Sequence, residues 1–452
     1  MSEALAPTTP LTYLGLAFCF VLTLAFEFSN GFHDTANAVA TVVYTHSLRP
    51  VQAVILPGAW NFLGVMLGGV AVAFALVELL PPDLLTPPNG NPAVAMLLTV
   101  FLAALIWNVS TWWFGLPSSI SHAIIGALLG IALVNAGFTR PGEGIDWSQV
   151  WGVLRALLVS PLLGFVLAGA LFRLVGWLVR DRALFEPTTE SRPSAWWVRT
   201  LLILTCSGVS FAHGSNDGQK SIGLIMLTVI GLAPAACALN PVATDPPRLA
   251  QAAADARPLI ERWGDGENAL AVADAARLAV ALGDRESLAA LSAVERSATR
   301  DAIYHVTAEL KVAVANRTAP PADREAAQRL RDVLRAPVEY VPAWVRLLSA
   351  VFLGAGTMIG YRRIVVTIGE RIGRRHLTPA QGASAEIVGA AGYSGLPVST
   401  THIITSGVAG TMVGSGAGVQ SQAVWQIALA WLLTLPVTVG LSAGLFWLFA
   451  RW

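Results

Sequence analysis

Long apolar runs recur along this chain and limit the kinds of fold that it can adopt. A helix of about 20 apolar residues crosses a hydrocarbon core about 30 Å thick. Only 13% of the residues are charged, against roughly 25% in an average soluble domain. One apolar run suits a core helix, but several predict an all-α polytopic membrane protein. The runs are 11–26, 51–80, 93–107, 150–179 and 423–452.

Arginines orient the predicted spans. Two stretches, 173–199 and 362–375, each carry five arginines, and the positive-inside rule makes both cytoplasmic. We expect about ten spans, or twelve if the short segments after Thr111 and Ala380 are counted as re-entrant, with the N-terminus outside. The first apolar run lacks a basic n-region and a small-residue cleavage site, which favours a span over a signal peptide.

One break in composition divides the chain. From 241 to 342 the sequence is rich in Asp, Glu, Arg and Ala, with helical periodicity and no spanning run. It predicts a small soluble helical insert on the periplasmic side. The expected division is a first membrane repeat at 1–180, a basic cytoplasmic linker at 181–199, the start of a second membrane repeat at 200–240, the insert at 241–342 and the remainder of the second repeat at 343–452.

Two pairs of matching motifs indicate an internal repeat. Residues 28–37, Phe-Ser-Asn-Gly-Phe-His-Asp-Thr-Ala-Asn, align with 211–220, Phe-Ala-His-Gly-Ser-Asn-Asp-Gly-Gln-Lys. A Gly-Leu-Pro-x-Ser-x-[Ser/Thr]-His string at 115–122 recurs at 395–402. Each predicted half has an odd number of spans, so the second copy is expected to be inverted. Inverted repeats with broken helices build binding sites at the bilayer midplane.

The first motif pair places Asp34 and Asp217 within predicted spans. A carboxylate in the hydrocarbon core costs several kcal/mol, so each must face a polar cavity or a partner. Both lie close to a glycine, Gly31 or Gly214, where we expect the helices to break. A broken helix offers carbonyls to a cation and amides to an anion. A purely structural ion pair is the alternative.

The second motif pair supplies hydroxyls and histidines. A proline in the first turn of a helix and nearby hydroxyls make an oxyanion cradle at the helix N-terminus. The alternative is that the hydroxyls bond to their own helix. His122 and His402 are candidates for proton relay or gating, or for packed interhelical donors. The candidate hydroxyls belong to Ser118, Ser119, Ser121, Ser399, Thr400 and Thr401.

With both motif pairs in view, the chain resembles the inorganic phosphate transporter (Pit) family, in particular its bacterial low-affinity branch. The resemblance implies secondary active phosphate uptake across the bacterial inner membrane, by protons or by sodium, with phosphate carried alone or as a neutral metal–phosphate complex. Arsenate is the expected mimic. The resemblance also assigns coupling-cation roles to Asp34, Asn37, Asn216 and Asp217, and phosphate contacts to the six hydroxyl residues.

One departure from the repeat bears on the coupling ion. Where the first motif has Asn37, the second has Lys220. A tethered cation disfavours a bound sodium ion, so Lys220 favours proton coupling. Lys220 is expected to pair with Asp217 or Asp34 in one conformation and to free that carboxylate to bind a proton in another. Its alternative is a lysine that snorkels to the interface. Sodium-coupled phosphate symport is the alternative function.

Other readings of the residues fall in different classes. A symporter for another tetrahedral oxyanion would use the same helix-end chemistry, and a channel is less suited to an inverted repeat. We expect no enzyme, because a duplicated Ser/His string suits a two-sided binding site and no nucleophile elbow is present. No cofactor, permanently bound metal or nucleic-acid partner is expected, although a divalent cation such as Mg²⁺ is a candidate for co-transport with phosphate. Homo-oligomerisation stays open.

Overall fold

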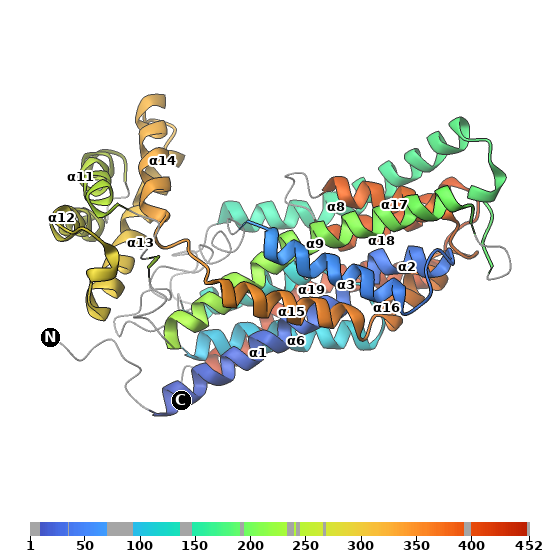
Figure 1. Ribbon diagram of the computed structural model, residues 1–452, viewed down its shortest axis with the longest axis horizontal. Helices are drawn as coiled ribbons and strands as arrows, with labels where there is room; N and C mark the ends of the chain where they lie inside the picture. The colour runs from blue at the N-terminus through green and yellow to red at the C-terminus, as the bar shows by residue number, and fades with distance from the viewer. Residues whose placement is uncertain are drawn as a thin grey trace. The chain divides into compact units, whose positions relative to one another are not determined.

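The computed structural model describes residues 10–34, 36–69, 94–135, 147–189, 194–232, 239–240, 245–264, 268–392 and 399–449. Helices dominate this part of the chain (Figure 1). The helices are α1 (Pro10–Asp34), α2 (Ala36–Tyr44), α3 (Gln52–Leu67), α6 (Val94–Trp113), α7 (Ile120–Asn135), α8 (Trp147–Leu178), α9 (Trp196–Leu232), α11 (Pro246–Trp263), α12 (Ala269–Gly283), α13 (Ala293–Ala315), α14 (Pro321–Arg335), α15 (Ala343–Met358), α16 (Arg362–Val366), α17 (Pro379–Gly392), α18 (Thr400–Gly414) and α19 (Ser421–Phe449). Short turns of 3₁₀-helix lie at Arg182–Leu184 and Leu288–Ala290, and a π-helical turn at Thr367–Arg371.

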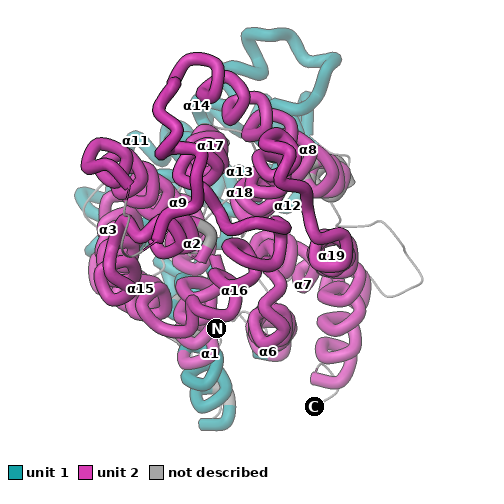
Figure 2. Tube along the Cα trace, turned by 90° about the vertical axis from the view of Figure 1, so that its right-hand side faces the viewer, with its two compact units in different colours: residues 1–20, 80–94, 224–342 teal, residues 21–79, 95–223, 343–452 magenta. Residues whose placement is uncertain are grey.

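The residues group into two compact units, which are coloured separately in Figure 2. The larger unit comprises 21–79, 95–223 and 343–452. The smaller unit comprises 1–20, 80–94 and 224–342. Both aspartate motifs and both Gly-Leu-Pro segments belong to the larger unit, so the candidate site is described within that unit alone.

Several helices are long and apolar enough to cross a membrane. Among the described residues, four meet this test, and a fifth candidate is the pair Ala343–Met358 and Arg362–Arg371, which is bent by 49°. Two shorter apolar helices, α3 and α7, fall below the length limit. Large apolar side chains on α8 face outward: Leu158 is 69% and Leu162 64% exposed. An exposed apolar surface of this kind suits contact with lipid. The ten-span count itself stays a prediction.

The two halves of the sequence interlock inside the larger unit. Helix α7 packs on α19, α8 packs on α18, and α3 packs on α15; the last pair can be followed in Figures 1 and 2. Matching glycines allow two of these contacts. A Cβ at Gly130 would overlap the backbone of α19, and a Cβ at Gly410 would overlap the backbone of α8. The shared glycine of the second motif pair therefore serves close helix packing in both copies.

The expected helix breaks at Gly31 and Gly214 are wrong. Helix α1 passes through Gly31 and ends at Asp34, and α9 runs without interruption through Gly214. Both glycines instead mark helix crossings. A Cβ at Gly31 would overlap the carbonyl oxygen of Leu353 in α15, and a Cβ at Gly214 would overlap that of Asn61 in α3. Glycine lets two backbones approach closely in a membrane protein without breaking either helix.

The smaller unit contains a helical core of its own, built from α11 to α14. Leu249, Ala253, Ala256 and Ile260 repeat at three- and four-residue spacing along α11 and are buried. Helix α13 starts with a capping box at Ser292, which satisfies free backbone amides of its first turn. Helices α11 to α14 therefore pack on one another through buried apolar side chains, and the insert at 241–342 stays a prediction. The membrane side on which they lie is still a prediction.

Candidate functional site

Asp34 stands at the end of α1, where that helix meets the start of α18. The Thr401 hydroxyl donates a hydrogen bond of 2.8 Å to Asp34 Oδ1. Asp34 is 7% exposed, so its charge is held almost entirely by protein groups. A buried carboxylate needs hydrogen bonds or a partner charge. The first aspartate motif thus contacts the Gly-Leu-Pro segment of the other half of the chain.

His213, in α9, lies between the two motif aspartates. Its Nε2 is 3.7 Å from Asp34 Oδ2 and 3.3 Å from Asp217 Oδ2. Its Nδ1 is 3.0 Å from Oδ1 of Asn61 in α3. An amide oxygen only accepts, so Nδ1 carries the proton and Nε2 faces the two carboxylates. Nε2 therefore faces both carboxylates, and it donates to one of them only when the ring is doubly protonated.

A second contact fixes the orientation of the Asn61 amide. Asn61 Nδ2 donates 2.8 Å to Thr357 Oγ1, whose own proton goes to the carbonyl of Leu353 at 2.9 Å. Because the Thr357 hydroxyl has one proton, it must accept from Asn61. The Asn61 oxygen is thus directed to His213. These hydrogen bonds of Thr357 in α15 and Asn61 in α3 therefore place a proton on Nδ1 of His213.

Lys220 lies one turn of α9 beyond Asp217. Its ammonium forms an ion pair with Asp217 Oδ1 and donates 2.6 Å to Ser121 Oγ. Ser121 is in the first turn of α7, so this bond joins the second aspartate motif to the first Gly-Leu-Pro segment. Asp217 is 6% exposed and has a cation at one oxygen and His213 at the other.

His33 connects Asp34 to the end of α6 and the approach to α7. Its Nδ1 is 3.4 Å from Asp34 Oδ1, and its Nε2 is 3.1 Å from Thr111 Oγ1 and 3.4 Å from Ser118 Oγ. The two hydroxyls are 3.0 Å apart. Ser118, a predicted phosphate contact, is therefore within two hydrogen bonds of the first aspartate.

The first Gly-Leu-Pro segment leads into a helix N-terminus, but not with proline in the first turn. Helix α7 begins at Ile120, so Pro117 precedes it, and the Pro117 carbonyl accepts 2.8 Å from the indole of Trp431. Pro397 lies outside the described residues. Ser399 caps α18, where its Oγ accepts from the backbone amide of His402 at 3.4 Å. A serine cap satisfies one free amide of the helix start.

His122 and His402 meet between the two helix starts. Their rings are stacked, with centroids 5.2 Å apart and planes 5° apart. His402 also lies against Trp431, with centroids 4.4 Å apart. The stack joins α7 to α18 and shows directly that the two duplicated segments adjoin. A relay or gating role for these histidines stays a prediction.

The structure joins several of the predicted site residues by direct contacts. Contacts join Asp34 to Thr401 and join Asp217, Lys220 and Ser121. Ser119 and Thr400 are buried beside the two helix starts. Asn216 is half-buried in α9. Ser118, Ser399, His122 and His402 occupy the contacts given above. The side chain of Asn37 lies outside the described residues.

Sequence reasoning missed two histidines that the structure places at the centre. Each ten-residue motif carries a histidine and an asparagine that lie three residues apart, in opposite order. The pairs are Asn30 with His33 and His213 with Asn216. This exchange is a signal that the sequence offered. Asn61 and Thr111 were not identifiable, because neither belongs to a motif and both reach the site only through packing.

Three of these side chains form a group that suits a cation. Asp34, His213 and Asp217 can each offer one oxygen or nitrogen, and these atoms lie within 4.8 Å of one another. Carboxylate oxygen and imidazole nitrogen are ligands for divalent ions such as Mg²⁺, Mn²⁺ or Zn²⁺, with carboxylates preferred by the harder ions. The group is buried, so an ion there would offset two carboxylate charges.

A helical bundle with lipid-facing apolar helices and a buried polar site where helix starts converge defines a multi-pass membrane transport protein. The family model described as the phosphate transporter family matches residues 30–442. The low-affinity inorganic phosphate transporter PitA of Escherichia coli (strain K12) is 40% identical over 479 residues, with 96% of each chain covered. PitB of the same strain is 39% identical over 483 residues, again with 96% of each chain covered.

More distant relatives agree. A probable low-affinity inorganic phosphate transporter of Bacillus subtilis (strain 168) is 28% identical, with 94% of this chain and 93% of the relative covered. A solved structure, described as the sodium-dependent phosphate transporter, aligns with a TM-score of 0.54 and 20% identity over 97% of this chain and 99% of that chain. At this identity the likeness shows the fold. The chain belongs to the phosphate transporter family, which confirms the resemblance; its relatives are named as transporters and not as enzymes.

Proposed function

We propose that this protein takes up inorganic phosphate with low affinity across the bacterial inner membrane, in symport with protons and by alternating access. Membership of the phosphate transporter family and the names of PitA and PitB support phosphate as the substrate. The site adds hydroxyl donors at two helix starts, which suit a tetrahedral oxyanion without any arginine. Neutral donors also favour release of the substrate after transport.

The observation that carries this proposal is the crosswise contact between the two halves. Asp34 of the first half accepts from Thr401 of the second half. Lys220 of the second half donates to Ser121 of the first half. Ser121 and Thr401 occupy the same position in the two Gly-Leu-Pro strings. A site formed by equivalent residues from both repeats is what an inverted-repeat transporter requires.

The charges favour protons as the coupling ion. Lys220 supplies a tethered positive charge at Asp217, in the place where a sodium ion would otherwise bind. Asp34 lies against a hydroxyl and two histidines. Histidine and aspartate can exchange a proton near neutral pH. We therefore assign the coupling proton to Asp34 and its histidines.

The group of Asp34, His213 and Asp217 supports transport of a metal–phosphate complex. A divalent ion held by the two carboxylates would offset the charge of hydrogen phosphate, which lowers the cost of taking the anion into a low-dielectric site. In this scheme the ion is cargo, bound and released with phosphate. Arsenate, which has the same geometry and charge, should compete for the same hydroxyls.

Labelled-phosphate uptake into proteoliposomes tests the proposal. An inward proton gradient is compared with an inward sodium gradient, each with and without Mg²⁺, for wild type and Asp34→Asn. We expect accumulation that is driven by protons, increased by Mg²⁺, inhibited by arsenate but not by sulfate, and absent in Asp34→Asn. Accumulation that needs sodium would show that sodium, and not the proton, is the coupling ion. Binding of sulfate without any phosphate accumulation would show that the substrate is another oxyanion.

A further inference from the structure

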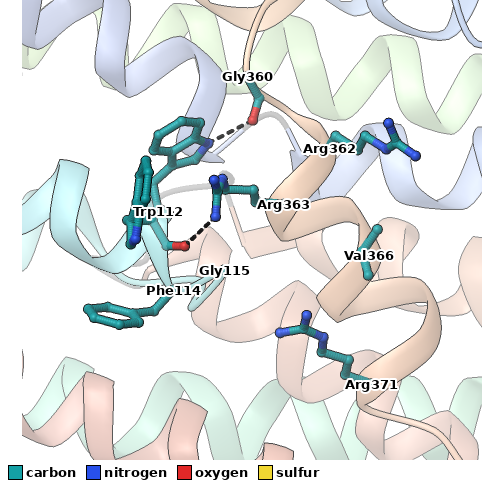
Figure 3. Close-up of a pocket in the computed structure, with 9 residues that line it drawn as sticks. Trp112, Phe114, Gly115, Gly360, Arg362, Arg363, Val366 and Arg371 are labelled. Carbon is teal, nitrogen blue, oxygen red and sulfur yellow. Dashed lines mark hydrogen bonds between the residues drawn. The ribbon is translucent and has the colours of Figure 1, made fainter.

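A cavity lies where the end of α6 faces α16, and neither motif aspartate lines it. Its volume is about 460 Å³, which is within the range of small-molecule sites, roughly 300–1,000 Å³. Figure 3 shows the aromatic end of α6 on one side and the arginines of the α16 segment on the other. The lining residues are Trp112, Trp113, Phe114, Gly115, Gly360, Arg362, Arg363, Val366 and Arg371.

The cavity is strongly cationic. Three arginines line it, and none of its lining residues is acidic. In Figure 3 the guanidinium groups of Arg363 and Arg371 extend toward the Trp112–Gly115 strip, whereas that of Arg362 extends to the other side of its helix. Within the described part of the chain, Arg371 forms no ion pair with a carboxylate. The adjacent carboxylate, Glu370, accepts a hydrogen bond of 2.6 Å from Tyr44.

Arg363 is held in place by its neighbours. Its Nη1 donates 2.8 Å to the carbonyl of Trp113, and its guanidinium carbon lies 4.3 Å from the centre of the Trp113 ring. The Trp112 indole in turn donates 2.7 Å to the carbonyl of Gly360. A fixed guanidinium loses little freedom when it binds an anion, and its planar fork matches a phosphate group.

The surroundings indicate the depth of the cavity in the bilayer. Trp113, the last residue of an apolar helix of spanning length, is 58% exposed, and Phe114 is 68% exposed. Exposed aromatic residues at the end of a span typically lie at the level of the lipid headgroups. An anion that reaches arginines there is either part of a lipid headgroup or dissolved in the adjacent water.

The cavity also adjoins the segment that leads to the transport site. Gly115 has a φ of +69°, and a Cβ there would lie 3.0 Å from the Arg363 carbonyl oxygen and 3.1 Å from Thr367 Oγ1. The close approach holds the start of the Gly-Leu-Pro segment against α16. Three residues further on, Ser118 contacts His33.

We propose that the cavity of Arg362, Arg363 and Arg371 is a binding site for a phosphate-bearing group, distinct from the transport site and supplied by an anionic phospholipid headgroup or by free phosphate. Arg371 and the anchored Arg363 bind the phosphate oxygens, and Arg362 adds charge at the rim. The exposed aromatic residues pack against the remainder of the ligand. This site goes beyond the proposed transport function and does not depend on it.

Binding measurements on the full-length purified protein test the proposal with two probes. In the first, native mass spectrometry counts phosphatidylglycerol retained from mixed micelles with phosphatidylcholine. In the second, equilibrium binding of labelled inorganic phosphate is measured in phosphatidylcholine nanodiscs. Both compare wild type, Arg371→Gln, Arg362→Gln/Arg371→Gln and Arg375→Gln. The last is the matched control, because Arg375 is exposed in the same basic stretch but does not line the cavity.

Arg371→Gln should weaken binding of one probe by about tenfold, the loss expected for one charge-assisted hydrogen bond, whereas Arg375→Gln should change it by less than about twofold. A loss of phosphatidylglycerol identifies a lipid site, and a loss of phosphate binding identifies a free-anion site. If neither probe responds to Arg371→Gln or to Arg362→Gln/Arg371→Gln, the proposal is overturned. A photoreactive phosphatidylglycerol or phosphate-analogue crosslink on wild type, mapped to 112–115 or 362–371, decides the matter if the variants fold poorly.

Discussion

The two aspartate motifs align in sequence but have different electrostatic environments. Asp217 is paired with Lys220 from its own helix, so its charge is balanced within the second motif. The first motif contains no lysine or arginine, and Asp34 lies against Thr401 and two histidines. The two motifs therefore hold carboxylates in different surroundings, and the second has Lys220 where the first has Asn37. We infer that Asp217 is a fixed structural charge and that Asp34 changes its occupancy during transport.

Asp34→Asn should have the largest effect. It keeps the shape of the side chain but removes the charge that Thr401, His33 and His213 face. A hydrogen bond to a charged group contributes about 1.5–3 kcal/mol, so losing more than one predicts a fall in uptake of about a hundredfold or more. Labelled-phosphate uptake in proteoliposomes measures it, with protein folding checked by size-exclusion chromatography. Uptake within threefold of wild type would show that Asp34 is not the working carboxylate.

Lys220→Gln should affect stability before it affects substrate binding. Removing one partner of a buried ion pair leaves an uncompensated charge, which costs about 3–5 kcal/mol. Thermal unfolding should therefore occur at a lower temperature, and adding Asp217→Asn should restore most of the loss. The matched control adds Asp34→Asn in place of Asp217→Asn. Equal rescue by both aspartate variants would contradict the assignment of Lys220 to Asp217.

The equivalent hydroxyls Ser121 and Thr401 offer a smaller test of the asymmetry. Thr401→Val removes a hydrogen bond to the charge of Asp34, and we expect KM for phosphate to rise about tenfold. Ser121→Ala removes only the second contact of Lys220. Lys220 keeps its ion pair with Asp217, so KM should rise about threefold or less. Thr411→Val is the control, because that hydroxyl donates to Val408 within the same helix α18. A reversed order would contradict the proposed tasks of the two motifs.

The glycines that the motifs share should behave alike. Gly31→Ala and Gly214→Ala each place a Cβ against a backbone carbonyl of a crossing helix, and overpacking of this kind costs about 1–3 kcal/mol. Gly208→Ala is the control in α9, where an added Cβ meets no atom within 4 Å. Thermal unfolding in detergent compares the three. If Gly208→Ala is as damaging as Gly214→Ala, the effect comes from the helix itself and not from the crossing.

The sequence predicted much of this architecture because the strongest physical constraints are local. Apolar runs predict helices, and the acidic, alanine-rich segment predicts the helical insert. The paired motifs also predict that Asp34, Asp217 and the hydroxyl residues converge, and contacts join Asp34 to Thr401 and Lys220 to Ser121. These inferences need only composition, spacing and the cost of a buried charge.

The errors and omissions come from tertiary packing. Glycine beside a polar residue suits both a helix break and a close crossing, and only the presence of α3 and α15 decides for the crossing. The tautomer of His213 depends on Asn61, which is far away in the sequence and in no motif. Pro117 precedes its helix, and its carbonyl accepts from Trp431 of α19. None of these contacts leaves a pattern in a single sequence.

The most direct test of the account replaces Lys220 with asparagine, the residue of the first motif. Labelled-phosphate accumulation by wild type and Lys220→Asn is measured in proteoliposomes under an inward proton gradient and, separately, an inward sodium gradient. The account predicts that wild type accumulates phosphate with protons alone and that Lys220→Asn loses proton-driven accumulation. Full proton-driven accumulation by Lys220→Asn would contradict it, because the two motifs would then work without the difference that separates them.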